Sequence, residues 1–350
     1  MNGRALVVGG GIAGLTVARG LLHGGWEVDV RERLVGPPDI GGALGVWPSA
    51  LAALDRLGLG EAVRERAEHR AEAALLRPDG RALLRTGAGD GAHLVSRSEL
   101  LRILVEGVPD GLVRWNTPVT VSDLAPGKRF DVIVGADGIH SLVRRTAFSR
   151  ARPPRPLGSI AYRGTLPGRV ERVTETWGGR RIFGVTPLGA HTTNWYAALD
   201  ARLLTEDERA APDVTAHAKV LRREFGGWHA EVARVLSGLE VHGVDRRALY
   251  DLPALGPYVR GRHALIGDAA HAMAPNLGRG ACESVVDAVV LADALNGEPT
   301  VPRALVRYDR ARRRPTRRIV AASRVLNRVS MTGLAGRLPA RAPAARSPFR

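Results

Sequence analysis

The sequence predicts an α/β protein in which a Rossmann-like domain is joined to a second domain with a mixed or antiparallel β-sheet. Three observations support this fold class. A strand, a glycine-rich turn and a helix follow one another over residues 5–22. Two further strands that lead through glycine into helices occur at residues 131–144 and 264–295. Residues 157–200, by contrast, consist of strand-like runs separated by glycine and proline turns, which is typical of an antiparallel sheet.

The first strand leads directly into a glycine-rich motif. Ala5 to Val8 is an apolar run, and the next six residues, Gly9-Gly10-Gly11-Ile12-Ala13-Gly14, match G-x-G-x-x-G. In this motif the first glycine makes the turn, the second lets a pyrophosphate approach, and the third lets the helix pack on the strand. A second strand over 26–31 is followed by Glu32, 18 residues after the last glycine, where an acid can bind ribose hydroxyls. The combination predicts a dinucleotide site, and a purely structural glycine turn is the alternative.

A later strand, loop and helix repeat this kind of arrangement. Ala264 to Ile266 is a short apolar run, and Asp268 follows it closely, where its carboxylate could accept hydrogen bonds from ligand hydroxyls. Residues 275–280 predict a loop whose two glycines allow close approach of a flat ligand, and helical spacing begins at Ala281. The N-terminus of such a helix favours negative charge. An ordinary strand-loop-helix without a ligand is the alternative.

Length and composition narrow the classes of protein to which this chain can belong. With 350 residues it can form two domains, and its 45% hydrophobic and 25% charged residues are typical of globular proteins. No run of 18 apolar residues occurs, so we expect no membrane span. The N-terminus enters a strand at once, which leaves no room for a signal peptide. The single cysteine, Cys282, excludes an internal disulfide and a multi-cysteine metal site, so we expect a cytoplasmic protein without a bound metal.

The positive charge is concentrated near the C-terminus. The net charge is +16, and residues 301–350 contain fourteen arginines and one acid, a net +13 that leaves +3 for residues 1–300. No nucleic-acid-binding motif accompanies these arginines, so we expect a solvated helix and tail and no nucleic-acid partner. The chain also lacks G-x-S-x-G, H-E-x-x-H and a phosphate loop ending in G-K-[ST], which argues against hydrolases, zinc proteases and nucleoside triphosphatases.

Three motifs carry a resemblance to a known family: GGGIAG near the N-terminus, DVIVGADGIHSLVR at 131–144 and LIGDAAHAMAPNLGRG at 265–280. Together they resemble the FAD-dependent aromatic-hydroxylase family, the single-component flavin monooxygenases typified by para-hydroxybenzoate hydroxylase. The resemblance implies FAD as cofactor and NAD(P)H as co-substrate. It also implies that O2 forms a flavin C4a-hydroperoxide, which hydroxylates or epoxidises an aromatic or polycyclic small molecule. The alternative is a reductase, dehydrogenase or halogenase of the same fold, and the halogenase motif W-x-W-x-I-P is absent.

The resemblance also implies which residues contact the cofactor. Glu32 would bind the adenosine ribose, while Arg33 and the backbone of Val119 would lie beside the adenine. Gly45 and Arg97 would lie along the ribityl-pyrophosphate. The full set of expected cofactor contacts is Gly9, Gly11, Ala13, Gly14, Glu32, Arg33, Gly45, Arg97, Val119, Asp137, Asp268, Pro275, Gly278, Arg279, Gly280 and Ala281.

The loop that would contact the flavin ring departs from the family pattern at one position. Asp268 would bind the ribityl and pyrophosphate region, and Gly278 to Ala281 would contact the isoalloxazine. Reduced flavin carries negative charge near N1 and C2=O, which the N-terminus of the following helix would stabilise. Arg279 stands where the family usually has glutamine. Its cation would either strengthen this stabilisation or point to solvent, and we expect the latter.

The change of pattern along the chain predicts the domain boundaries. The FAD-binding domain comprises residues 1–72, 90–155 and 253–300, and the substrate domain comprises residues 73–89 and 156–252. A C-terminal helix follows over 301–330, with a kink at Pro315, and residues 339–350 form a disordered tail. We expect the enzyme to be a monomer or a homodimer.

The substrate domain contains three candidate catalytic residues. Alternation along a strand puts Arg181, Phe183 and Val185 on one face of the sheet, and Tyr196 of the neighbouring run is expected to join them. Arg181 and Tyr196 would then hold a polar or anionic substituent of the substrate, with Arg163 as a further candidate. For each of the three, a solvent-facing strand residue is the alternative.

Overall fold

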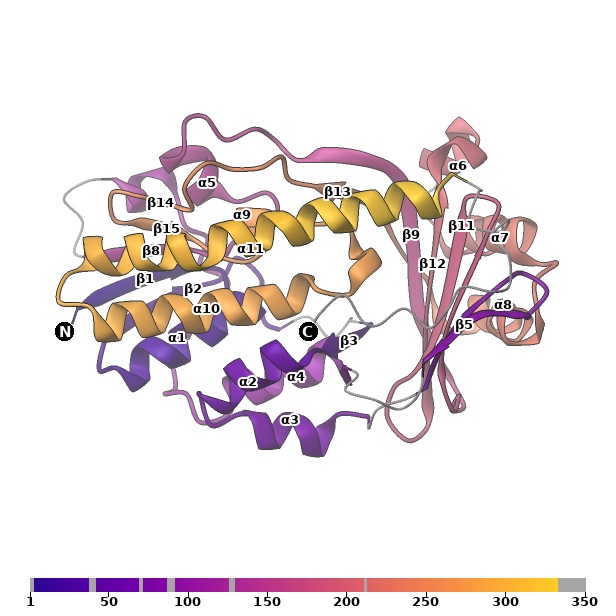
Figure 1. Cartoon of the computed structure of the whole chain (residues 1–350), viewed down its shortest axis with the longest axis horizontal. Helices are drawn as coiled ribbons and strands as arrows, with labels where there is room; N and C mark the ends of the chain where they lie inside the picture. Colours follow the sequence, from indigo (N-terminus) through magenta and orange to yellow (C-terminus); the bar gives the residue numbers. More distant parts are fainter. Residues whose placement is uncertain are drawn as a thin grey trace. The chain divides into compact units, whose positions relative to one another are not determined.

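The computed structural model describes residues 3–37, 42–68, 72–86, 92–125, 130–210 and 213–332. The chain divides into two compact units, each with its own sheet (Figure 1). Unit 1 comprises Met1–Arg66, Ser96–Arg155 and Tyr250–Arg324, and unit 2 comprises Ala67–Val95, Pro156–Leu249 and Val325–Arg350. Of the C-terminal helix that the sequence predicts over 301–330, residues 301–324 belong to unit 1 and residues 325–330 to unit 2. The expected tail at 339–350 lies outside the described residues.

In the described part of unit 1, six strands form a mostly parallel sheet in the order β14-β15-β8-β1-β2-β7. Only the β14–β15 pair is antiparallel among the strand pairs described there. The central strands are almost entirely buried, as expected for a parallel sheet with both faces covered. The strands are β1 (Arg4–Val8), β2 (Glu27–Arg31), β7 (Val113–Arg114), β8 (Val132–Gly135), β14 (Val259–Arg260) and β15 (His263–Leu265).

The register aligns the carboxyl ends of the central strands. Val8 of β1 pairs with Arg31 of β2 and with Gly135 of β8, and Gly135 also pairs with Leu265 of β15. The segments that follow these four strands therefore leave the sheet at one edge. Parallel α/β sheets bind their ligands at this edge. The three motifs and Glu32 are thus brought together by strand pairing, although up to 250 residues of chain separate them.

Helices pack on unit 1's sheet and on one another. α1 packs against α10, and a Cβ at Gly20 would lie 2.6 Å from the Cβ of Ala292, so glycine is needed for this close approach. The helices, including two short 3-10 helices, are α1 (Ile12–His23), α2 (Pro48–Asp55), α3 (Gly60–Arg66), α4 (Arg97–Val105), η1 (Val121–Leu124), α5 (Leu142–Ala147), α9 (Asp268–His271), η3 (Pro275–Leu277), α10 (Gly280–Gly297) and α11 (Val301–Ser330). The short strands β3 (Ala43–Val46) and β6 (His93–Ser96) lie outside both large sheets.

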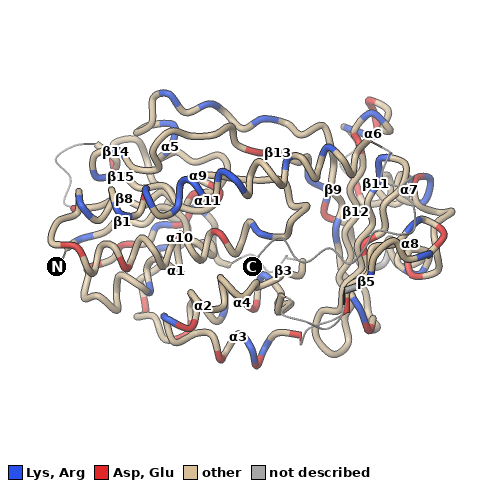
Figure 2. The backbone as a smooth tube through the Cα atoms, in the orientation of Figure 1, with Lys and Arg blue, Asp and Glu red and all other residues tan. Residues whose placement is uncertain are grey.

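The helix α11 is strongly amphipathic and carries much of the positive charge (Figure 2). It continues through Pro315 as one helix. Its buried positions hold apolar residues such as Leu305 and Tyr308, together with Arg312. Its exposed positions hold Arg303, Arg307, Arg310, Arg314, Arg317, Arg318 and Arg328. Among the described helices, none combines the length and apolar character needed to cross a bilayer.

In unit 2 the described strands form a seven-stranded sheet in the order β13-β9-β12-β11-β10-β4-β5. The β4–β10 pair is parallel, whereas β4–β5, β10–β11, β11–β12 and β9–β12 are antiparallel. The sheet is therefore mixed, which confirms the predicted fold class. The elements are β4 (Ala73–Leu76), β5 (Ala82–Thr86), β9 (Arg155–Pro167), β10 (Val173–Gly178), β11 (Arg181–Pro187), β12 (Thr192–Asp200), η2 (Ala201–Leu203), α6 (Glu206–Ala210), α7 (Val214–Phe225), α8 (Ala230–His242) and β13 (Asp245–Asp251).

The two faces of unit 2's sheet differ in what covers them. On the first face, Phe183, Val185 and Trp195 pack against residues of α7 and α8 such as Phe225 and Val232, forming unit 2's main core. Because side chains alternate along a strand, the intervening residues lie on the other face. This second face carries a smaller apolar cluster that also includes the end of α11, and its members are Leu75, Ala161, Trp177, Ile182, Tyr196, Ala198, Leu326 and Met331.

Candidate functional site

The three glycines of the motif after β1 differ in the space around the position that a Cβ would occupy. Gly9 has φ +108°, and a Cβ there would lie 2.5 Å from the carbonyl oxygen of Ala136. A Cβ at Gly14 would overlap the carbonyl oxygen of Gly9, so only glycine lets α1 pack this closely on the turn. A Cβ at Gly11, by contrast, would meet no atom within 4 Å. Gly11 therefore leaves open space at the N-terminus of α1, which suits the approach of an anionic pyrophosphate.

Glu32 is held by the backbone at the carboxyl end of β2. Its Oε2 accepts a hydrogen bond from the N–H of Gly10 at 2.7 Å, and its Oε1 accepts one from the N–H of Leu34 at 2.9 Å. Each carboxylate oxygen can accept two hydrogen bonds, so both retain capacity for ligand hydroxyls. The neighbouring Arg33 is exposed, and Val119 is half-buried against unit 1's core. The acid is thus fixed beside the glycine turn.

The third motif lies beside the first. Gly267 has φ +57°, and a Cβ built on it would lie 3.3 Å from the Cβ of Ala13 and 2.6 Å from Ser284 Oγ. Asp268 begins α9, and its exposed carboxylate makes no hydrogen bond or ion pair within the part of the chain that the structure describes. A free carboxylate at this edge of the sheet suits the hydroxyls of a ribityl chain.

The middle motif contributes Asp137, whose role is at least partly structural. Its Oδ2 accepts hydrogen bonds from the N–H groups of Leu142 at 2.6 Å and Val143 at 3.2 Å, at the start of α5. Its Oδ1 is buried and has no hydrogen-bond partner among the described residues. Burial raises the pKa of Asp137. Arg144 of the same motif is buried and donates to the carbonyl oxygen of Ala269 at 2.8 Å, which ties the middle motif to the third.

The first turn of α10 contacts the segment that contains β3. Cys282 donates its S–H to the carbonyl oxygen of Gly45 at 3.0 Å, and burial raises the pKa of this thiol to about 11. Cys282 is therefore a packing residue. The N–H of Arg97 donates to the carbonyl oxygen of Gly42 at 3.3 Å. The loop that precedes α10 contains η3, which begins at Pro275.

The N-terminus of α10 is open. Gly278 has φ +59°, so the chain turns sharply before the helix begins at Gly280. A Cβ at Gly280 would meet no atom within 4 Å, and Ala281 is half-buried. The first N–H groups of an 18-residue helix therefore lie next to open space. Such an end stabilises negative charge on a ligand.

Arg279 does not point to solvent, so the expectation for this residue is wrong. Its side chain is only 17% exposed and pairs with Glu283, one turn later on α10, with Nη2 2.7 Å from Oε1. The guanidinium carbon lies 5.8 Å from the centre of the Trp47 ring, and Nη2 lies 3.3 Å from Ser49 Oγ. The i, i+4 spacing of Arg279 and Glu283 could have indicated this pair from the sequence.

A buried charge cluster, formed by His271, Glu283, Asp287 and Arg312, continues from this pair. Arg312 of α11 contacts Glu283 with Nη2–Oε2 at 2.5 Å and Asp287 with Nε–Oδ1 at 2.6 Å. Asp287 Oδ2 accepts hydrogen bonds from His271 Nε2 at 2.5 Å and from the N–H of Gly267 at 2.9 Å. The cluster therefore connects Gly267 to the segment around Arg279. The sequence pattern missed Arg312, because it lay among many arginines.

Burial and charge act in opposite directions within the buried charge cluster. Burial alone would raise the pKa of Asp287, but His271 and Arg312 lower it below its ordinary value. Burial alone would lower the pKa of His271, but Asp287 raises it above its ordinary value. Both groups are thus stabilised in their charged forms by each other. His271 therefore serves this cluster.

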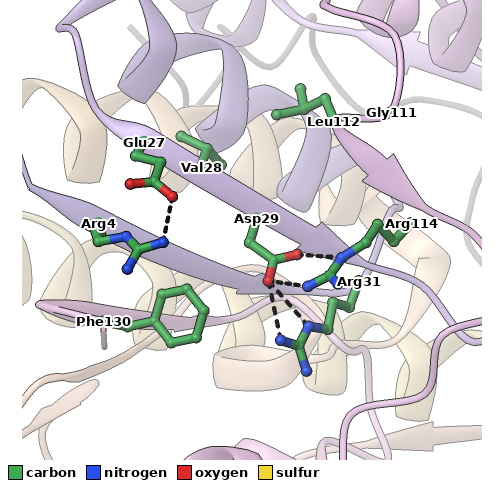
Figure 3. Close-up of a pocket in the computed structure, with 9 residues that line it drawn as sticks. All are labelled: Arg4, Glu27, Val28, Asp29, Arg31, Gly111, Leu112, Arg114 and Phe130. Carbon is green, nitrogen blue, oxygen red and sulfur yellow. Dashed lines mark hydrogen bonds and ion pairs between the residues drawn. The ribbon is translucent and has the colours of Figure 1, made fainter. Parts of the chain in front are cut away.

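A pocket along β2 is not part of this arrangement (Figure 3). It contains none of the expected cofactor contacts. Its charges satisfy one another, since Arg4 pairs with Glu27, and Asp29 pairs with both Arg31 and Arg114. Its lining residues are Arg4, Glu27, Val28, Asp29, Arg31, Gly111, Leu112, Arg114 and Phe130.

In unit 2 the structure separates one of the three candidate catalytic residues, Arg181, from the other two. Arg181 lies on the first face with Phe183, and its Nε is 2.8 Å from Glu224 Oε2 on α7. Tyr196 lies on the second face, because it pairs with Gly184, whereas Arg181 pairs with Leu199. The expectation that Tyr196 joins Arg181 on one face is therefore wrong.

Arg163 of β9 pairs directly with Tyr196 of β12, and it therefore lies on the second face as well. The Nε of Arg163 donates to Asp245 Oδ2 at 2.7 Å. One further polar residue of this face, Glu175, was not expected from the sequence. Glu175 accepts hydrogen bonds from the Tyr196 hydroxyl and, at 2.6 Å, from the indole Nε1 of Trp177.

Comparisons with known proteins agree with this geometry. Residues 3–323 match the family described as FAD binding domain. The chain is 32% identical to the aurachin C monooxygenase/isomerase of Stigmatella aurantiaca, over 91% of this chain and 87% of that protein. It is 34% identical to a 3-amino-4-hydroxybenzoate 2-monooxygenase of Streptomyces platensis, over 92% and 87%. Among solved structures, Klebsiella pneumoniae HpxO complexed with FAD and uric acid has a TM-score of 0.82 at 23% identity, covering 94% of this chain and 89% of that one, which shows a shared fold.

Proposed function

The chain belongs to the family of FAD-dependent aromatic hydroxylases, and on this premise we propose that it uses NAD(P)H and O2 to hydroxylate or epoxidise an aromatic or polycyclic small molecule. The observation that carries the proposal is the shared edge of unit 1's sheet. The glycine turn, Glu32 and Asp268 all lie at this edge, next to helix N-termini with open space. Bound FAD would supply the redox and oxygen chemistry, and the chain supplies binding, orientation and electrostatics.

Each part of this edge fits one part of FAD. The open space at Gly11 and the N-terminus of α1 would receive the pyrophosphate. Glu32 would accept hydrogen bonds from the ribose hydroxyls, and Asp268 from the ribityl hydroxyls. The N-terminus of α10 at Gly280 would lie against the electron-rich edge of the flavin ring. Because Glu283 neutralises Arg279, the stabilisation there would come from the N–H groups and dipole of α10 rather than from a free cation.

We place the substrate on the second face of unit 2's sheet. This face offers half-buried apolar and aromatic surface at Leu75 and Tyr196, and polar groups at the Tyr196 hydroxyl and Glu175. Arg163 remains a candidate because it shares the face with Tyr196. Arg181 is no longer a candidate, because it lies on the first face and is paired with Glu224. The single cysteine supports a reducing compartment, and we place the enzyme in the cytoplasm.

Glu32→Ala is expected to weaken FAD binding at least about tenfold, because hydrogen bonds to a charged group contribute about 1.5–3 kcal/mol each. The purified wild-type protein should be yellow and should release FAD rather than FMN on denaturation. The measurement is the Kd of the apoprotein for FAD, followed by flavin fluorescence. Glu27→Ala is the matched control, because Glu27 lies on the same strand, is exposed and pairs only with Arg4 within the described residues. Equal Kd values for the two variants would contradict the assignment of Glu32.

A true substrate, found by screening a panel of aromatic compounds for accelerated NAD(P)H consumption, is expected to gain one oxygen atom from O2. The measurement is the mass of the product formed under 18O2, compared with the product formed in H2 18O under ordinary O2. Label from 18O2 alone supports a monooxygenase. Equal conversion under strict anaerobiosis would instead identify a reductase or dehydrogenase of the same fold. A requirement for halide, with halogen in the product, would identify a halogenase.

A further inference from the structure

We infer that the second face of unit 2's sheet selects its ligand by charge, with Glu175 as the specificity-determining residue. It would accept a hydrogen bond from a neutral or cationic N–H or O–H group of an aromatic ligand, and it would disfavour a carboxylate. This inference rests on the proposed function only for the statement that the ligand is the substrate. It replaces the expectation of an anionic substituent held by Arg181.

The position of Glu175 follows from the register of three adjacent strands. Glu175 of β10 pairs with Gly184 of β11, and Gly184 pairs with Tyr196 of β12. The three residues therefore form one row on the second face. A Cβ at Gly184 would overlap the ring and the hydroxyl of Tyr196. Glycine in the middle strand thus lets the tyrosine ring lie across the backbone and donate its hydroxyl proton to Glu175, two strands away.

Trp177 fixes the carboxylate from the other side. It lies two residues after Glu175 on the same strand, and therefore on the same face, and its Nε1 donates to Oε1 at 2.6 Å. The Tyr196 hydroxyl donates to the other oxygen, Oε2. Each oxygen keeps a further lone pair for a ligand. Two rigid aromatic donors thus hold an acceptor in place on an apolar face.

No cation compensates Glu175 within the described residues. Arg163, which lies on this face, is paired with Asp245, and Glu175 forms no ion pair among the described residues. Burial raises the pKa of Glu175, and the hydrogen bonds from Tyr196 and Trp177 oppose this effect. Burial, followed by the charge of Glu175, raises the pKa of Tyr196 well above its ordinary value, so the tyrosine stays protonated.

The face therefore presents acceptors and negative charge to a ligand. The hydroxyl oxygen of Tyr196 is also an acceptor, because its proton is engaged by Glu175. A ligand N–H or O–H would satisfy these lone pairs, whereas a ligand carboxylate would add a second uncompensated negative charge beside Glu175. Leu75 and the ring of Tyr196, which are half-buried beside the apolar cluster of this face, provide surface for the ring of an aromatic ligand.

The test uses two probes of nearly equal shape, 4-hydroxybenzamide and 4-hydroxybenzoate, which differ in having a neutral amide or a carboxylate. Their Kd values for the FAD-loaded protein are measured by tryptophan fluorescence, without NAD(P)H. The wild-type protein is expected to bind the amide about tenfold more tightly, because the carboxylate of the benzoate and that of Glu175 are like charges that repel each other at close range. Glu175→Gln is expected to reduce this preference to about twofold or less, because it removes the charge and keeps the size.

Two further variants separate charge from folding. Glu171→Gln is the matched control, since Glu171 is exposed just before β10 and its removal should leave the preference unchanged. Tyr196→Phe should weaken the amide while keeping the discrimination against the carboxylate, because Glu175 retains its charge. Thermal melting of each variant shows whether it is folded.

The inference is overturned if the wild type binds the benzoate as tightly as the amide, if it binds neither probe, or if folded Glu175→Gln retains the full preference. Because the probes bind without turnover, these outcomes are independent of oxygen transfer. A failure of 18O incorporation would reject the monooxygenase and leave the charge preference standing. A true substrate that incorporates 18O but carries its essential carboxylate at this face would reject the charge preference alone.

Discussion

Arg312→Leu is expected to lower the free energy of unfolding by about 3–5 kcal/mol, because removing one partner of a buried ion pair leaves uncompensated charge in the interior. Arg312 is the shared partner of Glu283 and Asp287, both of which are buried. No other arginine or lysine of the described residues contacts Asp287, so His271 alone would remain to balance it. The measurement is urea unfolding of the apoprotein, followed by circular dichroism.

Arg310→Leu is the control for this prediction. Arg310 lies on the same helix, is exposed and makes no ion pair within the described ranges of the chain. Its removal should change the free energy of unfolding by less than about 0.5 kcal/mol. Arg312→Lys should fall between the two variants, because lysine keeps the charge and cannot donate to both carboxylates with the same geometry. A loss below about 1 kcal/mol for Arg312→Leu would show that the cluster relaxes or admits water.

The same substitution should reach the cofactor site. Asp287 holds the N–H of Gly267, directly before Asp268, and Glu283 holds Arg279. Loss of Arg312 would release both carboxylates from their common partner. We therefore expect weaker FAD binding in Arg312→Leu than in Arg310→Leu, measured by flavin fluorescence under conditions where both variants are folded. Unchanged FAD affinity in a destabilised Arg312→Leu would limit Arg312 to a role in stability.

Gly14→Ala and Gly11→Ala are expected to fail in different ways. At Gly14 the new Cβ would overlap the backbone carbonyl of Gly9, which cannot move without shifting the turn or α1. We expect a loss at or above the upper end of the roughly 1–3 kcal/mol that is typical of overpacked interiors, together with loss of FAD. At Gly11 the new Cβ meets no protein atom within 4 Å, so the stability of the apoprotein should change by less than about 0.5 kcal/mol.

FAD binding distinguishes the role of Gly11. If its open side receives the pyrophosphate, a methyl group there should weaken FAD binding at least about tenfold although the fold is intact. Urea unfolding of the apoprotein and the Kd for FAD give both quantities for each variant. Gly36→Ala is a suitable control, because it also has open space at the Cβ position and is not an expected cofactor contact. An unchanged Kd for Gly11→Ala would place the pyrophosphate elsewhere.

Features that depend on residues close together in the chain could be predicted from the sequence. The order of strand, glycine motif, helix and acid predicted the turn at Gly9 to Gly14 and the position of Glu32, because φ preferences and hydrophobic periodicity act over a few residues. The same reasoning identified the strand before Asp268 and the strand-rich character of residues 157–200. These patterns also carried the resemblance to the family, which the comparisons confirm.

Tertiary structure alone decided which face each strand residue occupies relative to residues of other strands. Alternation correctly put Arg181 with Phe183, but only the pairing of β11 with β12 shows that Tyr196 lies opposite them. A shift of one residue in register exchanges the two faces, and local pattern does not set the register between strands. Glu175 was overlooked for the same reason.

Partners of charged side chains were likewise decided by the fold. Arg279 was expected in solvent, because its contact with Trp47 requires a loop more than 200 residues away to lie beside it. Its pair with Glu283, by contrast, has the local i, i+4 spacing. Arg312 could not be distinguished in sequence from the exposed arginines around it. It lies on the buried side of α11, where two carboxylates from α10 need a cation, and a charge in the interior is stable only when such partners surround it.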